Sequence, residues 1–385
     1  MNYVVCHYHE IALKGKNRSF FEKQLVTNIK KTLPKGSFEF VKRISGRIIV
    51  KVSEKGKRQE KKIKNSLKNV FGIAYFALTN ISEQKIEKIK KKAEEILKRK
   101  RFKTFRISTK RSGKEFYLTS QKVNEKIGEY IVKKLKKRVN LGKPGITLFI
   151  EIVQDYVFLY TLKVKGYGGL PVGVSGKAIV LISGGIDSPV AAFLTMKRGV
   201  RVIFVHFHAH PYTDKASIEK VKRIVELLNK FQFKSKLYLV PFAFLQKEIV
   251  LKTPAKLRVI LYRRFMLRIC QEIAKKENIL ALVTGDSIGQ VASQTLENIK
   301  AIGEAVDIPV LRPLIGQNKE EIIEKAKEIG TFEISILPHQ DCCAVFLPRF
   351  AETKAKLREV KKAEKRLDIE KLVKKAIIEI LLVKI

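Results

Sequence analysis

The sequence contains little cysteine and little acid, and it has no long hydrophobic run. Its 385 residues include four cysteines, too few and too unevenly spaced for a disulfide framework, so a reducing, cytoplasmic location is expected. No apolar run reaches the roughly 18 residues of a membrane span, and the N-terminus lacks the apolar segment of a signal peptide. A chain of this length is expected to fold into two or three domains.

The shortage of acid leaves a formal net charge of +42, from 79 lysines and arginines against 37 aspartates and glutamates. Residues 1–174 hold 42 basic and 14 acidic residues, whereas residues 175–385 hold 37 and 23. Such an excess attracts polyanions, because each phosphate contact releases condensed counterions. Genome bias or a hot habitat would add glutamate along with lysine, and glutamate is scarce here. A nucleic acid is the expected partner, with an acidic membrane surface as the weaker alternative.

The first half is predicted to form two small α+β units. In residues 1–58, short apolar strands at 3–6 and 47–52 flank a helix at 18–33. A basic helix at 55–68 leads into the second unit.

The second unit is predicted to span residues 59–165, and Ser82 is expected to cap its first long helix. Its other predicted elements are strands at 74–78 and 102–108, a helix at 121–135, and a hairpin of 147–153 with 156–164. Basic residues crowd this unit and are candidates for RNA contacts, with a solvated helix face as the alternative. These candidates are Lys110, Arg111, Lys114, Lys133, Lys134, Lys137 and Arg138.

Residues 166–176 contain five glycines and one proline and form the predicted linker. From residue 177 to 385, apolar strands alternate with amphipathic helices, which predicts a parallel α/β sheet. The predicted strands are 178–182, 201–207, 236–240, 280–284 and a shorter one at Val310. The tail from Ala351 is predicted to be helical and either to pack on the sheet or to serve a dimer.

The most informative motif is Ser183-Gly184-Gly185-Ile186-Asp187-Ser188-Pro189, between a predicted strand and a predicted helix at 190–197. The glycines leave backbone N–H groups free to bind a phosphate, and the helix N-terminus adds partial positive charge. Ser188 or Asp187 is expected to cap the helix, with Pro189 at its first position. A carboxylate beside a phosphate is expected to hold Mg²⁺, which gives Asp187 a role. A tight strand-to-helix turn is the alternative that two glycines alone would satisfy.

This motif resembles the pyrophosphatase loop (PP-loop) of the ATP-α-hydrolases, which cleave ATP to AMP and pyrophosphate while they adenylate a substrate oxygen. The pattern G-x-x-x-x-G-K-[ST] is absent, so P-loop phosphoryl transfer is not supported. In a parallel α/β sheet the ligand binds at the carboxyl ends of the strands. At one such end His206, His208 and His210 alternate. Zinc is disfavoured there because the segment runs into Pro211 without a neighbouring cysteine or carboxylate, so contacts to adenine are expected instead of a protein metal site.

From end to end the chain resembles the tRNA 4-thiouridine synthetases, the ThiI family. Residues 9–18 are similar to the opening of their ferredoxin-like domain, and the unit at 59–165 is similar to a THUMP domain, which binds the tRNA acceptor end. Residues 168–173 resemble the family's linker, and 289–298 (GQVASQTLEN) and 312–316 (RPLIG) match its motifs. The resemblance implies ferredoxin-like and THUMP domains of the α+β class followed by a Rossmann-like α/β PP-loop domain.

The resemblance also implies tRNA as a partner, ATP and Mg²⁺ as cofactors, and a set of site residues. Lys319 matches a lysine that the family needs for activation, where a cation would offset charge on the α-phosphate. The expected ATP contacts, from the motif and the resemblance together, are Leu181, Ile182, Ser183, Gly184, Gly185, Ser188, His206, Phe207, Arg263, Gly285 and Gln294.

The family's sulfur-carrying cysteine matches Cys343, which would carry a persulfide because thiolate character governs sulfur reactivity. Cys342 is the adjacent alternative, and neighbouring cysteines seldom form an unstrained disulfide. Cys6 and Cys270 lie in apolar segments and are expected in the cores.

The resemblance thus implies an ATP-dependent tRNA uracil 4-sulfurtransferase. Asp187 and Lys319 are expected to support adenylation of uridine at position 8 of tRNA, and sulfur from Cys343 is expected to displace AMP. No cysteine follows Cys343, so the chain resembles the short branch without a rhodanese domain. A cysteine desulfurase or another donor is then expected to supply sulfur, and no role in thiamine thiazole synthesis is predicted.

Three alternatives are open. A PP-loop enzyme that thiolates C2 of a pyrimidine is disfavoured because no C-x-x-C occurs. A tRNA-binding protein without catalysis is disfavoured by the intact motif with Lys319 and Cys343. An enzyme that adenylates a small molecule would leave the basic first half unexplained.

Overall fold

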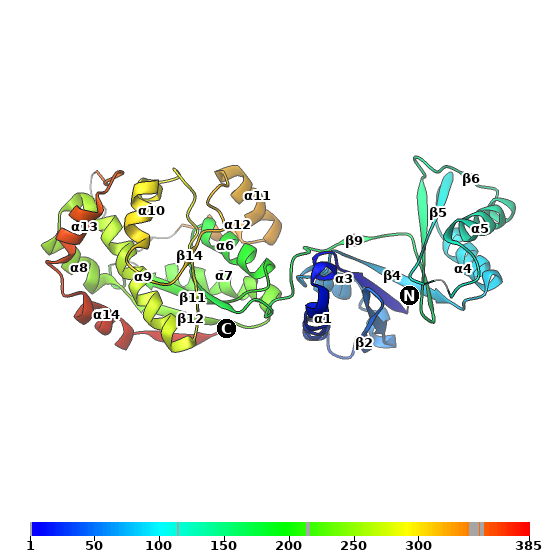
Figure 1. Ribbon diagram of the computed structural model, residues 1–385, viewed down its shortest axis with the longest axis horizontal. Helices are drawn as coiled ribbons and strands as arrows, with labels where there is room; N and C mark the ends of the chain where they lie inside the picture. Colours follow the sequence, from blue (N-terminus) through cyan, green and yellow to red (C-terminus); the bar gives the residue numbers. More distant parts are fainter. Residues whose placement is uncertain (1, 114, 213–215, 339–345, 347–349) are drawn as a thin grey trace. The chain divides into compact units, whose positions relative to one another are not determined.

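The computed structural model describes residues 2–113, 115–212, 216–338, 346 and 350–385. The chain folds into two compact units, residues 1–171 and 172–385. Figure 1 colours them from blue to green and from green to red. Each unit has its own sheets and its own apolar core.

The first unit contains strands, α-helices and two short 3₁₀ helices. Its strands are β1 Tyr3–His7, β2 Phe38–Ile44, β3 Arg47–Val52, β4 Tyr75–Ser82, β5 Thr104–Arg111, β6 Arg138–Val139, β7 Ile146–Val153, β8 Tyr156–Tyr160 and β9 Val164–Lys165. Its helices are η1 Glu10–Leu13, η2 Gly15–Asn17, α1 Arg18–Thr32, α2 Glu54–Lys57, α3 Glu60–Lys68, α4 Ile86–Lys98 and α5 Ser120–Leu135.

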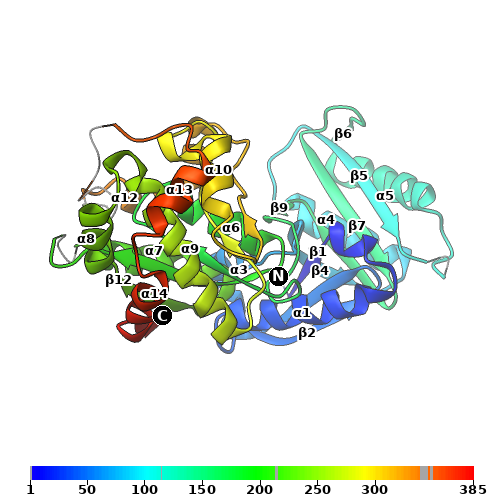
Figure 2. The same ribbon diagram turned by 60° about the vertical axis from the view of Figure 1, so that its left-hand side comes forward.

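The strand β4 belongs to both halves of the first unit. Its first residues pair antiparallel with β1, and its last three residues pair with β8, giving the strand order β2-β3-β1-β4-β8-β7-β5-β6. The helices α4 and α5 cover the β5–β7 region (Figure 2), with Ile89, Ala93 and Leu97 of α4 buried at helical spacing against it. The sheet therefore runs through the whole unit.

The predicted helix start at Ser82 is wrong. Ser82 is the last residue of β4 and pairs with Val157, and α4 begins at Ile86 after Lys85, whose side chain makes no cap bond. Strand pairing with β8 outweighs the local preference of serine for a helix N-cap. The predicted helix at 55–68 is likewise two short helices, α2 and α3, and the predicted strand at 156–164 is two short strands, β8 and β9. The strands β2 and β6 were not predicted.

A buried carboxylate joins the two halves of this sheet. Glu151 on β7 is 2% exposed, and its carboxylate contacts Arg47 of β3, Tyr160 of β8 and, at 2.9 Å, His7 Nε2 of β1. Burial alone would raise the pKa of Glu151, but the hydrogen bond and charge of His7 and the charge of Arg47 outweigh it and lower the pKa to about 2. The ionised form is therefore the one that the fold stabilises.

The second unit alternates strands and helices. Its strands are β10 Lys177–Leu181, β11 Arg201–His208, β12 Lys236–Pro241, β13 Leu282–Val283, β14 Val310–Leu311 and β15 Leu381–Lys384. Its helices are α6 Asp187–Lys197, α7 Ala216–Gln232, α8 Ala243–Lys252, η3 Ala255–Leu257, α9 Arg258–Glu277, η4 Ala292–Gln294, α10 Leu296–Gly303, α11 Lys319–Ile329, α12 Phe332–Ser335, α13 Leu357–Glu364 and α14 Ile369–Ile378.

The sheet of this unit has the strand order β14-β13-β10-β11-β12-β15. The first five strands are parallel, as predicted, and they are apolar on both faces because helices cover both faces. The helices α6 and α7 pack on one face, and α9 packs on the other, where α8, α13 and α14 surround it (Figures 1 and 2). Chain order reverses between β10 and β13, so a crevice is expected at the carboxyl ends of these two neighbours.

The C-terminal tail packs on the sheet, which was one of the two predicted alternatives. The helices α13 and α14 contact α9, and β15 pairs antiparallel with β12. The prediction of helix to the end of the chain is wrong at β15, because Leu381–Lys384 completes the exposed edge of β12. Arg264 of α9, 1% exposed, holds the tail through a bidentate pair with Glu364 of α13 at 2.8 and 2.9 Å. In the part of the chain that the structure describes, no helix is both long and apolar enough to cross a membrane.

Glu151→Gln is expected to remove an acid-sensitive part of the stability of the first unit. Since the pKa of Glu151 is about 2 in the folded unit and near 4.5 when unfolded, its ionised form stabilises the fold above about pH 4.5. That contribution is lost as the pH falls towards 2. We expect wild type to lose about 2 kcal/mol more than the variant between pH 6 and pH 3. Urea-dependent hydrogen exchange at amides of β7 and β8 measures this.

Glu39→Gln is the matched control, because Glu39 pairs with Lys51 on the surface. It should leave the pH dependence unchanged. Equal pH dependence of wild type and Glu151→Gln would contradict the assignment.

Candidate active site

The glycine loop, residues 183–188, connects β10 to α6 and closes on itself through its two serines. The Ser183 N–H donates to Ser188 Oγ at 2.9 Å, and the Gly185 N–H donates to Ser183 Oγ at 3.3 Å. The helix α6 begins at Asp187 with Ile186 as N-cap, and no side chain caps it. The predicted capping by Ser188 or Asp187 is therefore wrong, because the Ser188 hydroxyl accepts from the Ser183 N–H instead. The predicted position of Pro189 is wrong as well, because the helix begins at Asp187 and Pro189 is its third residue.

Gly285, just after β13, lies against the start of α6. A Cβ on Gly285 would stand 2.9 Å from the Ser188 nitrogen and 3.0 Å from the Asp187 carbonyl carbon. Real Cβ atoms do not approach backbone this closely, so only glycine lets the end of β13 reach the glycine loop. This contact brings the two sides of the crevice together.

Asp187 meets two side chains from distant parts of the sequence. Its Oδ1 lies 2.6 Å from Lys319 Nζ, and its Oδ2 accepts from Gln290 Nε2 at 2.8 Å. Lys319 is the first residue of α11, which Asn318 and Glu321 start with a reciprocal capping box. The capped helix start holds the Lys319 ammonium at the glycine loop.

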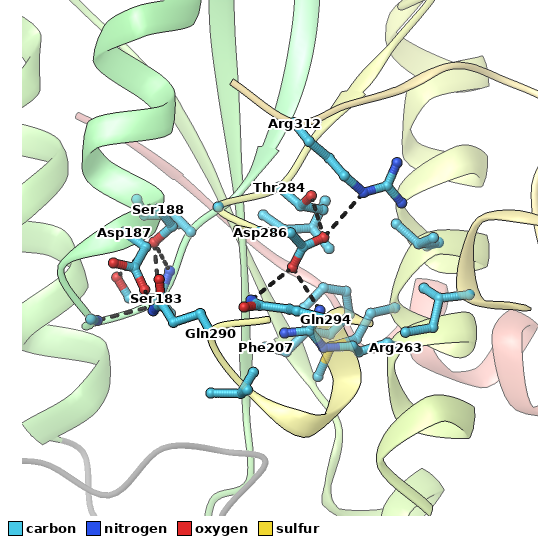
Figure 3. Close-up of a pocket in the computed structure, with 18 of the residues that line it drawn as sticks. Ser183, Asp187, Ser188, Phe207, Arg263, Thr284, Asp286, Gln290, Gln294 and Arg312 are labelled. Atoms are coloured by element: carbon cyan, nitrogen blue, oxygen red, sulfur yellow. Dashed lines mark hydrogen bonds and ion pairs between the residues drawn. The ribbon is translucent and has the colours of Figure 1, made fainter. Parts of the chain in front are cut away.

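Asp286, 5% exposed, is the second carboxylate of the crevice and has four polar neighbours (Figure 3). Its Oδ1 accepts from Arg263 at 2.7 Å and from Gln294 at 3.2 Å, and its Oδ2 accepts from Thr284 at 2.7 Å and from Arg312 at 3.4 Å. Burial alone would raise the pKa of Asp286, but the charges of Arg263 and Arg312 and the Thr284 hydroxyl outweigh it, so the pKa lies below its usual value. Asp286 is therefore ionised and forms ion pairs with the guanidinium groups of Arg263 and Arg312.

Between these two carboxylates lies a cavity of about 360 Å³ at the carboxyl ends of β10, β11 and β13. Most of the residues expected to contact ATP line it: Leu181, Ile182, Ser183, Gly185, Ser188, His206, Phe207, Arg263, Gly285 and Gln294, together with Asp187. Gly184 lies in the loop but not on the cavity wall, and Lys319 reaches the site through Asp187. The structure thus brings the predicted residues of this unit together from five stretches of the sequence.

Several cavity residues were not assigned from the sequence. They are Met266, Leu267, Thr284, Asp286, Gln290, Val291, Ile302 and Arg312. Asp286 had a usable signal, because it follows a predicted strand and a glycine, and Gln290 and Arg312 stand inside the two motif stretches. Met266 and Ile302 had none, since apolar residues of helices usually belong to the core.

The three alternating histidines do not share the cavity, because His208 and His210 do not line it. The His206 ring is buried, with Nδ1 3.0 Å from the Ile182 carbonyl oxygen, and it lines the cavity. Burial and then the nearby His210 lower the pKa of His208. Among the described residues, no group of three or more histidines, cysteines, aspartates or glutamates is placed to hold a metal ion.

Known proteins match this chain over almost its whole length. The family model of the thiamine biosynthesis protein (ThiI) matches residues 173–369, the ThiI ferredoxin-like domain matches 3–77, and the THUMP domain matches 83–162. A probable tRNA sulfurtransferase of Caldanaerobacter subterraneus subsp. tengcongensis is 44% identical over 95% of both chains. One of Thermus thermophilus is 41% identical over 97% of this chain and 91% of its own.

The chain belongs to the ThiI family.

Solved structures agree with this assignment. The crystal structure of a 4-thiouridine synthetase–RNA complex with bound ATP superimposes with a TM-score of 0.90 at 37% identity, and each chain is covered completely. A Pyrococcus horikoshii protein superimposes with a TM-score of 0.63 at 29% identity, over 86% of this chain and all of its own. The ferredoxin-like, THUMP and PP-loop architecture predicted from the sequence is therefore confirmed.

In the THUMP region of this ThiI protein, the candidate RNA-binding residues form two groups. Lys133 and Lys134 lie at the end of α5, and Lys137 lies just before Arg138 of β6, which pairs with the beginning of β5. Lys110 and Arg111 lie at the other end of β5, about 20 Å away at the usual rise of a strand. Arg111 also braces its own loop, because it donates to the carbonyl oxygens of Phe116 and Leu118 at 2.8 and 2.7 Å. Lys114 lies outside the described residues.

The cysteines of this ThiI chain divide in the same way between described and undescribed parts. Cys6 and Cys270 are fully buried in the two cores, as predicted, and burial raises the pKa of both thiols, which makes them poor nucleophiles. Cys342 and Cys343 lie outside the described residues.

Gly285→Ala is expected to destabilise the second unit by about 1–3 kcal/mol, because the added methyl must displace the backbone of Asp187 and Ser188. Gly316→Ala is the matched control: a Cβ there meets nothing within 4 Å, so a change within about 0.5 kcal/mol is expected. Urea-dependent hydrogen exchange of β10 and β11 amides gives both free energies of unfolding. Equal values for the two variants would show that the close approach at Gly285 does not constrain the fold.

Proposed function

We propose that this ThiI protein is an ATP-dependent tRNA uracil 4-sulfurtransferase that forms 4-thiouridine at position 8 of tRNA. The observation that carries the proposal is the glycine loop with Asp187 and Lys319 at 2.6 Å, at the carboxyl edge of the sheet. Family membership and the similarity to a 4-thiouridine synthetase–RNA complex with bound ATP support it. The two basic halves of the sequence supply the charge that a tRNA needs.

ATP is proposed to lie in the 360 Å³ cavity, with its phosphates at the glycine loop. The loop amides and the N-terminus of α6 attract phosphate oxygens, and Lys319 adds a full positive charge at the same place. The adenosine moiety would contact the apolar wall formed by Leu181, Phe207 and Met266. Arg263 and Gln294, both held by Asp286, provide polar groups at the opposite side from the loop.

The residues present fit Mg²⁺ bound together with ATP. Mg²⁺ usually takes one or two carboxylates and fills its remaining positions with phosphate oxygens and water. In the described part of the site, Asp187 is the carboxylate at the glycine loop, where Lys319 and Gln290 contact it, whereas Asp286 binds Arg263 and Arg312 on the opposite side of the cavity. Asp187 would therefore hold the ion, which neutralises charge on the phosphates when it is bound.

Adenylation requires uridine O4 to attack the α-phosphorus while pyrophosphate leaves and the N3 proton departs. Negative charge grows on the α-phosphate and on the leaving group. Lys319 lies at the start of α11 and 2.6 Å from Asp187, so its ammonium is held where that charge develops. The Asp187 carboxylate keeps Lys319 oriented before the nucleotide enters.

Sulfur transfer is proposed to use Cys343 as the persulfide carrier. The terminal sulfur bonds to C4, the C4–O bond breaks, and AMP leaves with its electrons. A thiol of the sulfur donor then attacks the Cys343 sulfur, which breaks the bond to the transferred sulfur and releases 4-thiouridine, and the proton of that thiol goes to N3. Cys343 is left in a mixed disulfide with the thiol, and a second thiol, supplied as an external reductant, reduces it. A cysteine desulfurase is the expected source of that sulfur. Whether the protein forms a homodimer stays a separate prediction.

The first unit is proposed to bind tRNA through both of its basic groups. Lys110 lies near Lys163, whose ammonium stands 4.0 Å from the centre of the Phe149 ring. Burial and the charge of Lys110 lower the pKa of Lys163, so this end of β5 gathers positive charge beside aromatic rings. Aromatic faces beside cations suit unstacked bases and phosphates of RNA.

The test incubates the protein with an unmodified tRNA transcript, ATP, Mg²⁺ and either sulfide or a cysteine desulfurase with cysteine. Nucleosides are then separated and identified by mass spectrometry. Wild type should form 4-thiouridine with either donor, and Asp187→Ala should lower the rate at least about 100-fold. Cys343→Ala should fail with the desulfurase and keep activity with sulfide. Cys270→Ala, at a buried thiol, is the control and should behave as wild type.

Formation of 2-thiouridine or 2-thiocytidine would replace the proposal by C2 thiolation. Binding of tRNA without any thiolated nucleoside would leave a binding protein.

Asp286→Asn is expected to raise the KM for ATP about tenfold or more, since Arg263 and Arg312 would lose the charge that aligns them. Glu277→Gln is the matched control, because Glu277 is also a partly buried carboxylate with a lysine partner, Lys236, at 2.5 Å, but it does not line the cavity. Its KM for ATP should equal that of wild type. The KM is measured from tRNA-dependent pyrophosphate release, and an unchanged value in Asp286→Asn would rule out the positioning role.

A further inference from the structure

The short helix α12 lies between the glycine loop and α7. Ser335, its last residue, is 5% exposed, and its Oγ donates to the Gly185 carbonyl oxygen at 3.2 Å. On the other side, Lys220 of α7 donates from Nζ to the carbonyl oxygens of Ser335 at 2.7 Å and Leu337 at 2.6 Å. These contacts connect residues 185, 335 and 220 in one continuous chain of hydrogen bonds.

Lys220 is 4% exposed, which is unusual for lysine. Removing an ammonium group from water costs several kcal/mol unless polar partners replace the water. The carbonyl groups at the end of a helix lack intrahelical donors. Lys220 donates to the carbonyl of Ser335, the last residue of α12, and to that of Leu337, two residues beyond the helix. A charged side chain buried at this cost fixes the end of α12 in one position.

The Ser335 contact bears on the glycine loop itself. In a trans peptide the C=O and the following N–H point in opposite directions within one plane. Because Ser335 holds the Gly185 carbonyl, it sets the plane of the Gly185–Ile186 peptide and with it the direction of the Ile186 N–H. Amide groups of this loop are those that would bind phosphate, and Gly185 lines the cavity.

We infer that Ser335 and Lys220 are positioning residues for nucleotide activation: Ser335 orients a peptide of the glycine loop, and Lys220 holds Ser335 in place. The inference rests on the proposed function, because it assigns ATP to the cavity. Neither residue belongs to the motif that identifies the loop; they stand 150 and 35 residues away from Gly185 in the sequence.

The test measures the KM for ATP and the kcat of tRNA-dependent pyrophosphate release for Ser335→Ala, Lys220→Met and the double variant. Pyrophosphate release does not require sulfur or Cys343. Each single variant should raise the KM for ATP about tenfold, at unchanged affinity for tRNA. The double variant should have about the same KM for ATP as the single variants, because both substitutions break the same chain of contacts.

Lys230→Met is the matched control. Lys230 also stands on α7 and donates to a helix-end carbonyl, that of Ile329 at 2.6 Å, but α11 and not the glycine loop receives this contact. Its KM for ATP should equal that of wild type.

A purely structural role gives a different result. Partial unfolding lowers the amount of active enzyme and hence the apparent kcat, but it leaves the KM of the folded fraction unchanged. An unchanged KM in Ser335→Ala, or a double variant whose effect is the product of the two single effects, overturns the inference. Absence of pyrophosphate release in wild type would overturn the proposed function instead. If Lys220→Met does not fold, Ser335→Ala decides the question alone.

Discussion

Asp286 holds together side chains from four separate parts of the second unit through one buried carboxylate. It accepts hydrogen bonds from Thr284 beside it, Arg263 on α9, Gln294 on η4 and Arg312 after β14. A buried carboxylate is stable only with such partners, because its own desolvation opposes ionisation. The cavity wall opposite the glycine loop therefore depends on the hydrogen bonds to Asp286, because these bonds hold Arg263, Gln294 and Arg312 in fixed positions relative to one another.

The near wall depends on a different constraint, which is steric. Gly285 allows the end of β13 to touch the start of α6, so Asp286 and Asp187 come to stand on opposite sides of one cavity. Asp187 also contacts Lys319 at the start of α11 and Gln290 in the loop between β13 and η4. One acidic group thus organises each wall. The positive partners, Lys319, Arg263 and Arg312, leave the cavity suited to an anion with an apolar portion.

Outside the cavity the same fold supplies support rather than chemistry. Ser335, held by Lys220, binds the Gly185 carbonyl oxygen of the glycine loop. Arg264, next to Arg263 on α9, binds Glu364 and so holds the tail helix α13 against α9. In the first unit Glu151 plays an analogous part, because it joins β1, β3, β7 and β8 across the sheet. These buried charges sit between elements that are remote in sequence, where a misplaced partner would leave an uncompensated charge.

Local pattern was a good guide where local physics decides the structure. The strand, the glycine loop and α6 follow from apolar runs, glycines and a helix-forming segment, so their place could be predicted from residues 178–197. Prediction failed where pairing across the chain decides: Ser82 looks like a helix cap but joins β8, and the tail looks helical to its end but adds β15 to β12. The serine that appeared to cap α6 instead closes the glycine loop. In the first two cases a distant strand offered the backbone better hydrogen-bond partners than the local helix. In the third case the Ser183 N–H, five residues earlier, bonds to the Ser188 hydroxyl in place of a helix-capping contact.

The sequence by itself determined the charge, the alternation of strands and helices between residues 177 and 311, the glycine loop and the family, because these depend on composition, periodicity and contiguous motifs. Only the tertiary structure decided which single residues meet. Asp187 with Lys319, Asp286 with Arg263 and Arg312, and Ser335 with Gly185 are pairs separated by 23 to 150 residues. No short-range rule links such residues. They come together because parallel strands place their carboxyl ends along one edge, and the helices on both faces deliver their side chains to it.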